Sequence, residues 1–151
     1  MAVQIADISP KRDVVDRFKT LYQTLNADNC KRGIIEDVYE SSLLFEDSFH
    51  SIEGVNNFVD YCASLYQNLL SCDFAFHDQW VRDNDAMLNW TMDYAHPKLN
   101  KGEIISLEGA SLIRFDSKIY FHRDYFDGGQ LLYEHVPVMG RVIRTLKHMM
   151  K

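Results

Sequence analysis

Apolar residues along the chain recur with two different periods. In the first 70 residues they return every three or four positions, which is the period of a helix with one buried face. This spacing predicts helices over residues 10–25, 34–39 and 55–69, with a brief strand at 43–47 between the second and the third. Ser9 and Pro10 mark the start of the first helix, because serine caps helices and proline is tolerated at the first helical position.

After residue 71 the period changes to two, which is the period of a β-strand. Strands are predicted at about 72–82, 86–96, 103–115 and 118–127, and Pro137 begins a closing helix that runs to residue 150. We expect Gly109 to mark a bulge or bend at which the sheet curls. Helices followed by antiparallel strands in meander order are typical of an α+β fold, with helices packed on one face of a curved sheet. The 151 residues contain no repeat or linker and are expected to form one domain.

The last predicted strand, at 118–127, carries the most informative residues of the chain. Because neighbouring side chains on a strand point to opposite faces, one face is predicted to hold Tyr120, His122, Asp124 and Phe126, and the other Ile119, Phe121, Arg123, Tyr125 and Asp127. A carboxylate between aromatic side chains on a largely apolar face is costly unless it is paired, hydrogen-bonded or kept protonated. Asp124 is therefore the first candidate for a functional residue.

The composition narrows the classes of function. The chain is 46% hydrophobic and 25% charged, which is typical of a globular domain, and its net charge of −6 argues against binding to a phosphate backbone. A nucleic-acid partner is therefore not expected. The cysteines Cys30, Cys62 and Cys72 are odd in number and form no Cys-x-x-Cys pair, which argues against a disulfide framework or a zinc site.

The sequence also bears on location. The first ten residues do not show the basic and then apolar order of a signal peptide, and no run approaches the ~20 apolar residues of a membrane span. We therefore expect a cytoplasmic protein. Arg141, Arg144, Lys147 and Lys151 lie on one face of the last predicted helix. We interpret this face as solvated, and we expect no membrane partner because the whole chain is acidic.

Three motifs resemble those of the nuclear transport factor 2-like superfamily, and within it the SnoaL-like branch. They are Leu25-Asn26-Ala27-Asp28 at the end of the first helix, Phe45-Glu46-Asp47 leading into Ile52-Glu53-Gly54, and Arg123-Asp124-Tyr125-Phe126-Asp127. The resemblance covers nearly the whole chain and implies a cone, in which a strongly curved, mostly antiparallel sheet wraps around the N-terminal helices and leaves a hydrophobic pocket. Members include limonene-epoxide hydrolases, ketosteroid isomerases, polyketide cyclases and non-catalytic binding modules, so the fold alone does not name a reaction.

The resemblance assigns roles to two carboxylates. Asp124 matches the first Asp of the Arg-Asp-Tyr-Phe-Asp motif of the epoxide hydrolases and the general acid/base of the polyketide cyclases. Asp47 matches the general base of the ketosteroid isomerases. The other two members of the hydrolase triad fall at Trp90 and Met92, so that triad is incomplete here. For Asp47 an alternative stays open, since a residue between a strand and a turn is often a turn-former or a helix cap.

A ligand-binding wall follows from strand parity and from the family pattern. It comprises mainly apolar side chains with a few polar ones, a usual constitution for a small-molecule site: Trp90, Met92, Tyr94, Ile105, Leu107, Ser111, His122 and Phe126. We expect a small hydrophobic ligand and an isomerase, cyclase or hydrolase that uses Asp124 and Asp47 for acid/base chemistry without a cofactor. The alternative is a non-catalytic module that binds a ligand or a protein. No spacing of His or Cys predicts a metal site.

The outward face of the last strand predicts self-association. Ile119, Phe121 and Tyr125 would expose a large hydrophobic patch there, which soluble monomers rarely tolerate. Relatives of this fold commonly pair through the same face, as the resemblance implies. We therefore expect a homodimer through the outer face of the sheet, unless residues 131–150 fold back to cover that face within one chain.

Overall fold

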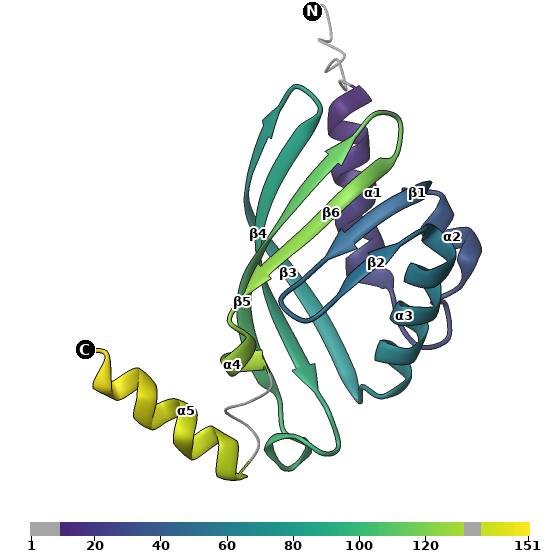
Figure 1. Ribbon diagram of the computed structural model, residues 1–151. Helices are drawn as coiled ribbons and strands as arrows, with labels where there is room; N and C mark the ends of the chain where they lie inside the picture. The colour runs from purple at the N-terminus through teal and green to yellow at the C-terminus, as the bar shows by residue number, and fades with distance from the viewer. Residues whose placement is uncertain (1–9, 132–136) are drawn as a thin grey trace, which may run out of the picture.

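The structure, a computed structural model, describes residues 10–131 and 137–151 (Figure 1). Ser9, the predicted helix cap, lies outside the described residues. In chain order the elements are α1 (Pro10–Thr24), α2 (Arg32–Glu36), β1 (Tyr39–Glu46), β2 (Ser51–Glu53), α3 (Val55–Gln67), β3 (Ser71–Arg82), β4 (Asp85–Ala95), the 3-10 turn η1 (Asn100–Gly102), β5 (Ile105–Phe115), β6 (Ile119–Phe126), α4 (Gly128–Leu131) and α5 (Pro137–Met149). The α+β order is as predicted, with β2 and α4 as short elements that the sequence pattern did not predict.

The two long N-terminal helices each bury one apolar stripe. The buried side chains are Val14, Val15, Phe18 and Leu21 on α1, which packs against β3, and Val55, Phe58, Cys62 and Tyr66 on α3, which packs against β1. The second predicted helix is wrong at its C-terminal end, because α2 ends at Glu36 and Tyr39 begins β1. Over so short an apolar run, periodicity does not distinguish a helix from a strand. Among the described residues, no helix is long and apolar enough to cross a membrane.

The strands form one sheet in the order β2-β1-β6-β5-β4-β3. Strands β3 to β6 are consecutive antiparallel neighbours, which confirms the predicted meander. β1 lies parallel to β6 on the other side, and the short strand β2 pairs antiparallel with β1. Figure 1 shows a strongly twisted sheet, with α2 and α3 beside β1. The sheet is thus mixed but mostly antiparallel.

An irregularity at the start of β6 changes which side chains face the core. Arg114 pairs with Phe121, whereas the next residue, Phe115, pairs with Ile119, so one extra residue is accommodated on β6. Ile119 is consequently fully buried, and Tyr120 is 39% exposed. The predicted outward position of Ile119 and inward position of Tyr120 are therefore wrong. From Phe121 onwards the predicted alternation holds.

Gly109 has a packing role and does not mark a bulge. It pairs with Trp90 in an unbroken stretch of the β4–β5 ladder. A Cβ atom at Gly109 would lie 2.3 Å from Cη2 of Trp90, a distance that real Cβ contacts do not reach. The absent side chain therefore provides the space in which the indole ring lies across the inner face of the sheet.

Cations cover two aromatic rings on the outer face of the sheet. The guanidinium carbon of Arg114 lies 5.1 Å from the ring centre of Phe121, and that of Arg123 lies 5.2 Å from the ring centre of Tyr125. With Ile119 in the core, the outward patch is smaller and more polar than the sequence indicated. The homodimer through this face stays a prediction.

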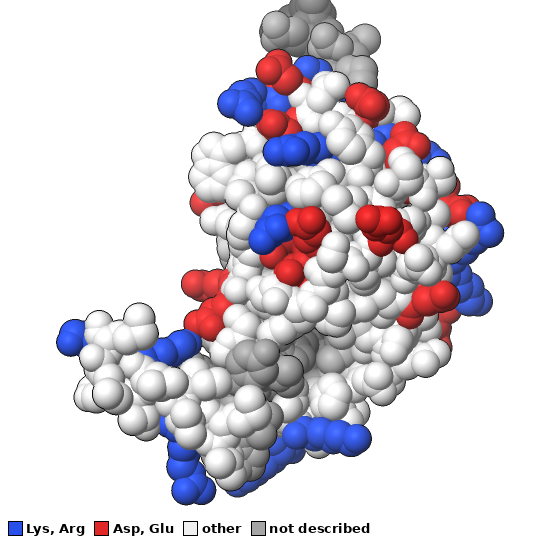
Figure 2. All heavy atoms as spheres, in the orientation of Figure 1, with Lys and Arg blue, Asp and Glu red and all other residues white. Residues whose placement is uncertain are grey.

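Charged side chains are unevenly distributed along the chain. Figure 2 shows carboxylates over the body of the molecule, whereas α5, at the lower left, presents blue and white atoms. Residues 137–151 hold four of the 16 lysines and arginines and none of the 22 aspartates and glutamates. The C-terminal helix is thus a basic element on an acidic chain.

Candidate functional site

Cross-strand register arranges the predicted site residues in rows on the inner face of the sheet. Asp124 on β6 lies opposite Ser111 on β5. The following rows are Phe126 with Gly109 and Trp90, Leu107 with Met92, and Ile105 with Tyr94. Asp124 therefore lies within a wall that contains the predicted ligand-binding residues, with the row of His122 and Ile113 on its other side.

The carboxylate of Asp124 is held by two short hydrogen bonds to the same oxygen. Ser111 Oγ donates to Oδ1 at 2.6 Å, and His122 Nε2 lies 2.6 Å from the same atom. Ser111 in turn accepts a hydrogen bond from Trp90 Nε1 at 2.9 Å. Indole N–H is a donor only, so the hydroxyl hydrogen of Ser111 is directed to the carboxylate. Both donors stabilise negative charge on Oδ1.

His122 connects this carboxylate to two tyrosines from other elements. Its Nδ1 lies 2.8 Å from the hydroxyl of Tyr39 on β1, and that hydroxyl lies 2.7 Å from the hydroxyl of Tyr22 on α1. If Nε2 donates to ionised Asp124, Nδ1 of a neutral imidazole accepts from Tyr39. The hydrogen bonds then run in one direction, from Tyr22 through Tyr39 and His122 to Asp124.

Aromatic rings enclose the imidazole of His122, which is 1% exposed. Its ring centre lies 5.0 to 5.9 Å from those of Phe18, Tyr22, Tyr39 and Phe45. Burial raises the pKa of Tyr22 and of Tyr39 well above the ordinary value for a phenol. Both hydroxyls therefore remain protonated donors at neutral pH, which fits the direction of the chain.

One oxygen of Asp124 remains available. The side chain is 21% exposed, and within residues 10–131 and 137–151 no hydrogen bond reaches Oδ2. In the neighbouring rows, Met92 and Phe126 are half-buried, and so is Phe74, whose ring lies 5.4 Å from that of Trp90. The open side of the carboxylate thus lies beside apolar side chains that keep some exposed surface.

The rest of the predicted wall is packed into the core. Tyr94, Ile105 and Leu107 are buried, and the Tyr94 hydroxyl donates to the backbone carbonyl of Leu131 at the end of α4. Burial raises the pKa of Tyr94 to about 12. Of the ten predicted site residues, Trp90, Ser111, His122 and Asp124 are joined by hydrogen bonds, while Met92, Tyr94, Ile105, Leu107 and Phe126 belong to the same inner face.

Asp47 lies in a separate cluster after β1. Its Oδ1 accepts the backbone N–H groups of Phe49 and His50, at 2.8 and 2.7 Å, and lies 3.2 Å from His50 Nδ1. Its Oδ2 accepts the hydroxyl of Tyr61 at 3.1 Å. The side chain of Asp47 is only 5% exposed, and that of His50 is 47% exposed. Burial, with the carboxylate of Asp47 beside it, raises the pKa of Tyr61. These contacts are those of a turn-forming aspartate.

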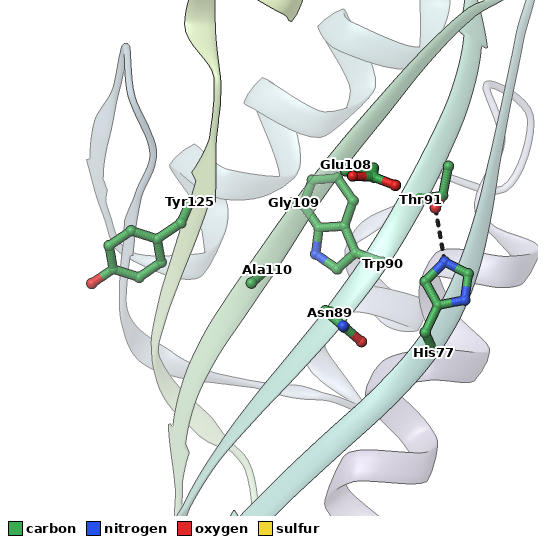
Figure 3. A pocket seen from close by; sticks show the side chains of 8 residues that line it. All are labelled: His77, Asn89, Trp90, Thr91, Glu108, Gly109, Ala110 and Tyr125. Carbon is green, nitrogen blue, oxygen red and sulfur yellow. Dashed lines mark hydrogen bonds between the residues drawn. The ribbon is translucent and has the colours of Figure 1, made fainter.

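A hollow of about 370 Å³ lies against the sheet (Figure 3). Glu108, Ala110 and Tyr125 in its lining alternate along their strands with the residues of the Asp124 face, so the hollow lies on the opposite face. Its lining contains both polar and apolar groups: His77, Asn89, Trp90, Thr91, Glu108, Gly109, Ala110 and Tyr125. His77 Nε2 lies 2.7 Å from Thr91 Oγ1. Trp90 is the one predicted ligand-binding residue in this lining, so the hollow is not the site expected from the sequence.

Tyr22 and Tyr39 are the functional candidates that the sequence analysis did not identify. Tyr22 follows Leu21, near which the resemblance places the helix-one tyrosine of the ketosteroid isomerases, and Tyr39 was assigned to the wrong element. Phe18 and Tyr22 lie four positions apart on one helix face, and Tyr39 and Phe45 are six positions apart on one strand face. That spacing indicates inward positions, but not the contact with His122. Among the described residues there is no group of three or more His, Cys, Asp or Glu side chains that could hold a metal ion.

Solved structures with similar folds cover most of this chain. A candidate SnoaL-like polyketide cyclase from Jannaschia sp. CCS1 is 13% identical, with a TM-score of 0.67, over 83% of this chain and 92% of that one. A nuclear transport factor 2-like protein of unknown function from Burkholderia pseudomallei K96243 is 9% identical, with a TM-score of 0.69, over 82% and 95%. A protein with a ketosteroid isomerase-like fold from Catenulispora acidiphila DSM 44928, in complex with trimethylamine, is 10% identical, with a TM-score of 0.67, over 80% and 89%. At these identities the likeness shows the fold alone.

A comparison with curated protein sequences gives no match. The SnoaL-like domain family, in contrast, matches residues 18–122, which is more than half of the chain. The matched span includes Tyr22, Tyr39, Ser111 and His122, and it ends two residues before Asp124. The chain therefore belongs to the SnoaL-like domain family, within the nuclear transport factor 2-like fold.

Proposed function

We propose that this protein binds a small, mainly apolar carbonyl compound and that Asp124 exchanges a proton with it as a general acid/base, without a cofactor. The observation that carries the proposal is the pair of 2.6 Å hydrogen bonds from Ser111 Oγ and His122 Nε2 to Asp124 Oδ1. They hold the carboxylate in one orientation and leave Oδ2 on the open side.

A carboxylate held in this way is suited to moving a proton at a carbon next to a carbonyl group. General acid/base catalysis requires the group to reach the reacting proton directly or through one water molecule, and Asp124 is 21% exposed. Met92 and Phe126, both half-buried in the neighbouring rows, supply apolar surface for the carbon skeleton of the ligand. This chemistry is shared by isomerases and cyclases.

For Asp47 we propose a supporting role. Both of its oxygens accept hydrogen bonds from its own turn or from Tyr61, and its side chain is 5% exposed. A carboxylate occupied by these donors fixes the turn between β1 and β2, which borders the end of β6 through the hydrogen bond from Ser48 Oγ to the Phe126 carbonyl. Asp124 is therefore the acid/base that the proposal depends on.

Hydrogen–deuterium exchange at the α-carbon of 2-tetralone, an apolar cyclic ketone, tests the proposal. Exchange in D₂O needs only enolisation, so the natural reaction need not be known. We expect the protein to accelerate the exchange over buffer and Asp124→Asn to abolish the acceleration. Asp93→Asn, the same change at an exposed position of β4, is the control and should keep it. Acceleration that survives in Asp124→Asn would contradict the assignment.

The alternative function is binding without chemistry. It is favoured by His122, which is 1% exposed and uses both ring nitrogens inside the protein, so that it cannot pass a proton to solvent directly. In that case 2-tetralone would bind, and would raise the thermal unfolding temperature by mass action, but its hydrogens would exchange no faster than in buffer.

A further inference from the structure

The C-terminal helix α5 presents a wide apolar face. Val138, Val142, Leu146 and Met149 are each more than half exposed, at 72%, 55%, 54% and 74%. They recur at intervals of three or four residues and so lie within one arc of the helix. Met139, also exposed, falls in the same arc. Exposed apolar surface that is concentrated on one element marks an interaction site.

The opposite arc of α5 is basic. At about 100° per residue, Arg141 and Arg144 lie on the side of the helix away from Val142 and Leu146. Residues 137–151 contain no aspartate or glutamate. A wide apolar arc opposite an arc of lysine and arginine is the composition of helices that lie in a membrane interface.

The rest of the protein contacts α5 along one side of the helix. Lys147 Nζ lies 2.6 Å from Asp127 Oδ2, just after β6. Ile143 Cγ2 lies 3.4 Å from the place that a Cβ atom on Gly129 would occupy, and Gly140 is buried. These contacts lie between the apolar and basic arcs. Figure 1 shows the helix projecting from the end of the sheet. The exposure of Val138, Val142 and Leu146 shows that the core does not cover the apolar arc.

The β4–β5 loop, residues 96–104, lies at the same end of the molecule as α5 (Figure 1). Exposed apolar and basic side chains occur together there as well. Leu70 and Ile104 are 64% and 65% exposed. Ile104 follows two exposed cations, Lys98 and Lys101, in the segment around η1, which also contains the exposed Glu103. A Cβ atom on Gly102 would lie 3.7 Å from Leu70, which brings this apolar side chain to the loop.

We propose that α5 and the β4–β5 loop dock the protein on the surface of a bilayer that contains anionic phospholipids. The apolar arc enters the boundary between headgroups and acyl chains. The cations beside it reach the phosphates, because lysine and arginine extend their charged ends towards the polar layer. The proposal replaces the expectation of a solvated helix face and is independent of proton transfer by Asp124.

Charge complementarity favours an anionic bilayer over a second copy of the chain. At physiological salt a charge acts over only about 8 Å, so a membrane in contact with α5 meets the local positive charge and not the net charge of −6. A groove on a second copy would cover the apolar arc and leave the opposite basic arc in water. A layer of headgroups contacts both flanks of a helix that lies in it.

Co-sedimentation of the full chain with lipid vesicles tests this proposal. We expect binding to vesicles of phosphatidylcholine mixed with phosphatidylglycerol, at least about tenfold weaker binding to phosphatidylcholine alone, and weaker binding at high salt. Leu146→Glu should reduce binding by more than about tenfold, since it removes apolar surface and adds a negative charge. Trp80→Glu makes the same kind of change at a 60% exposed residue of β3 and should bind like the wild type.

A second variant, Ile104→Glu in the loop, should also weaken binding, and circular dichroism checks that each variant is folded. The proposal is overturned if the unaltered chain stays in the supernatant with both kinds of vesicle, or if Leu146→Glu binds as well as Trp80→Glu. It is also overturned if light scattering finds a dimer that Leu146→Glu dissociates while no vesicles are bound. A second copy would then be the partner of the apolar arc.

Discussion

The described residues include two pairs of an aspartate and a histidine, and the buried member differs between the two pairs. In the pair on β6 the histidine is the buried member, with 1% of the His122 side chain exposed and 21% of Asp124. In the pair after β1 the carboxylate is the buried member, with 5% of the Asp47 side chain exposed and 47% of His50. The member at the surface therefore differs between the two pairs.

This difference shows how the same residue types serve different purposes. His122 uses Nδ1 for Tyr39 and Nε2 for Asp124, so it fixes the carboxylate and cannot itself meet a ligand. Asp47 accepts two backbone N–H groups and the hydroxyl of Tyr61, so it fixes a turn. The buried member of each pair supports the fold, and only the β6 pair leaves a carboxylate beside apolar side chains.

The largest expected effect is on stability when the buried histidine is removed. His122→Ala leaves a cavity among four aromatic rings and removes one hydrogen-bond partner from Tyr39 and one from Asp124. We expect it to lower the free energy of unfolding by at least about 3 kcal/mol. The matched change His50→Ala, at the exposed histidine, should cost less than about 0.5 kcal/mol. Urea denaturation of both variants measures the two costs, and similar losses would show that burial does not distinguish the pairs.

Substitution of Asp47 should mainly lower the free energy of unfolding, whereas substitution of Asp124 should mainly abolish proton exchange with the ligand. Asp47→Ala removes the acceptor of two backbone N–H groups and should cost about 2 kcal/mol in the free energy of unfolding. Asp124→Asn keeps an oxygen that can accept from Ser111 and should cost less than about 1 kcal/mol, while it abolishes any exchange of 2-tetralone hydrogens. Denaturation and exchange assays on the same samples check both statements. Loss of exchange only in Asp47→Ala would reverse the assignment.

The sequence was informative about this site where the pattern is local. Strand alternation alone predicted that His122 and Asp124 share a face, and the helical spacing on α1 predicted the buried stripe against which His122 packs. The residue pairs that complete the site are distant in the chain. Tyr39 and His122 are 83 positions apart, and no period within one element encodes their contact.

Two predictions failed because they depended on a neighbouring strand. Ile119 faces inward because Phe115, and not Asp116 as in an unbroken ladder, is its partner on β5. Gly109 makes space for Trp90, which is distant in the chain but opposite in the ladder. Side-chain direction within a strand can be predicted from its own sequence. The position of a bulge, and the side chain that fills the space beside a glycine, depend on the neighbouring strand.

Alkaline pH should lower the free energy of unfolding through Tyr39, which is hydrogen-bonded to His122 of the β6 pair. Burial raises the pKa of Tyr39 above its ordinary value of 10.0 in the folded chain. The unfolded chain therefore loses this proton first, so the stability that a protonated Tyr39 contributes is complete below pH 10 and is lost as the pH rises further. The loss is about 1.4 kcal/mol for each pH unit between the two pKa values. Tyr39→Phe should unfold with a shallower dependence on pH above 10, and an unchanged slope would contradict the role of burial.

The smallest expected effect on stability comes from removing one hydrogen-bond donor to the carboxylate of each pair. Ser111→Ala removes a donor to Asp124 and the acceptor of Trp90 Nε1, so it leaves a buried N–H without a partner and should cost about 1 to 2 kcal/mol. Tyr61→Phe removes one donor to Asp47, which keeps two backbone N–H groups, and should cost less than about 1 kcal/mol.

A spectroscopic signal separates these two changes from a general loss of packing. The chain has two tryptophans, and Trp80 is 60% exposed while Trp90 is 4% exposed. In a Trp80→Phe background the fluorescence therefore reports Trp90 alone. Ser111→Ala should shift its emission, because the indole N–H loses its partner, whereas Tyr61→Phe should leave the emission unchanged. Equal shifts in the two variants would mean that the two pairs are coupled through the core, and the division between a supporting pair and a chemical pair would then fail.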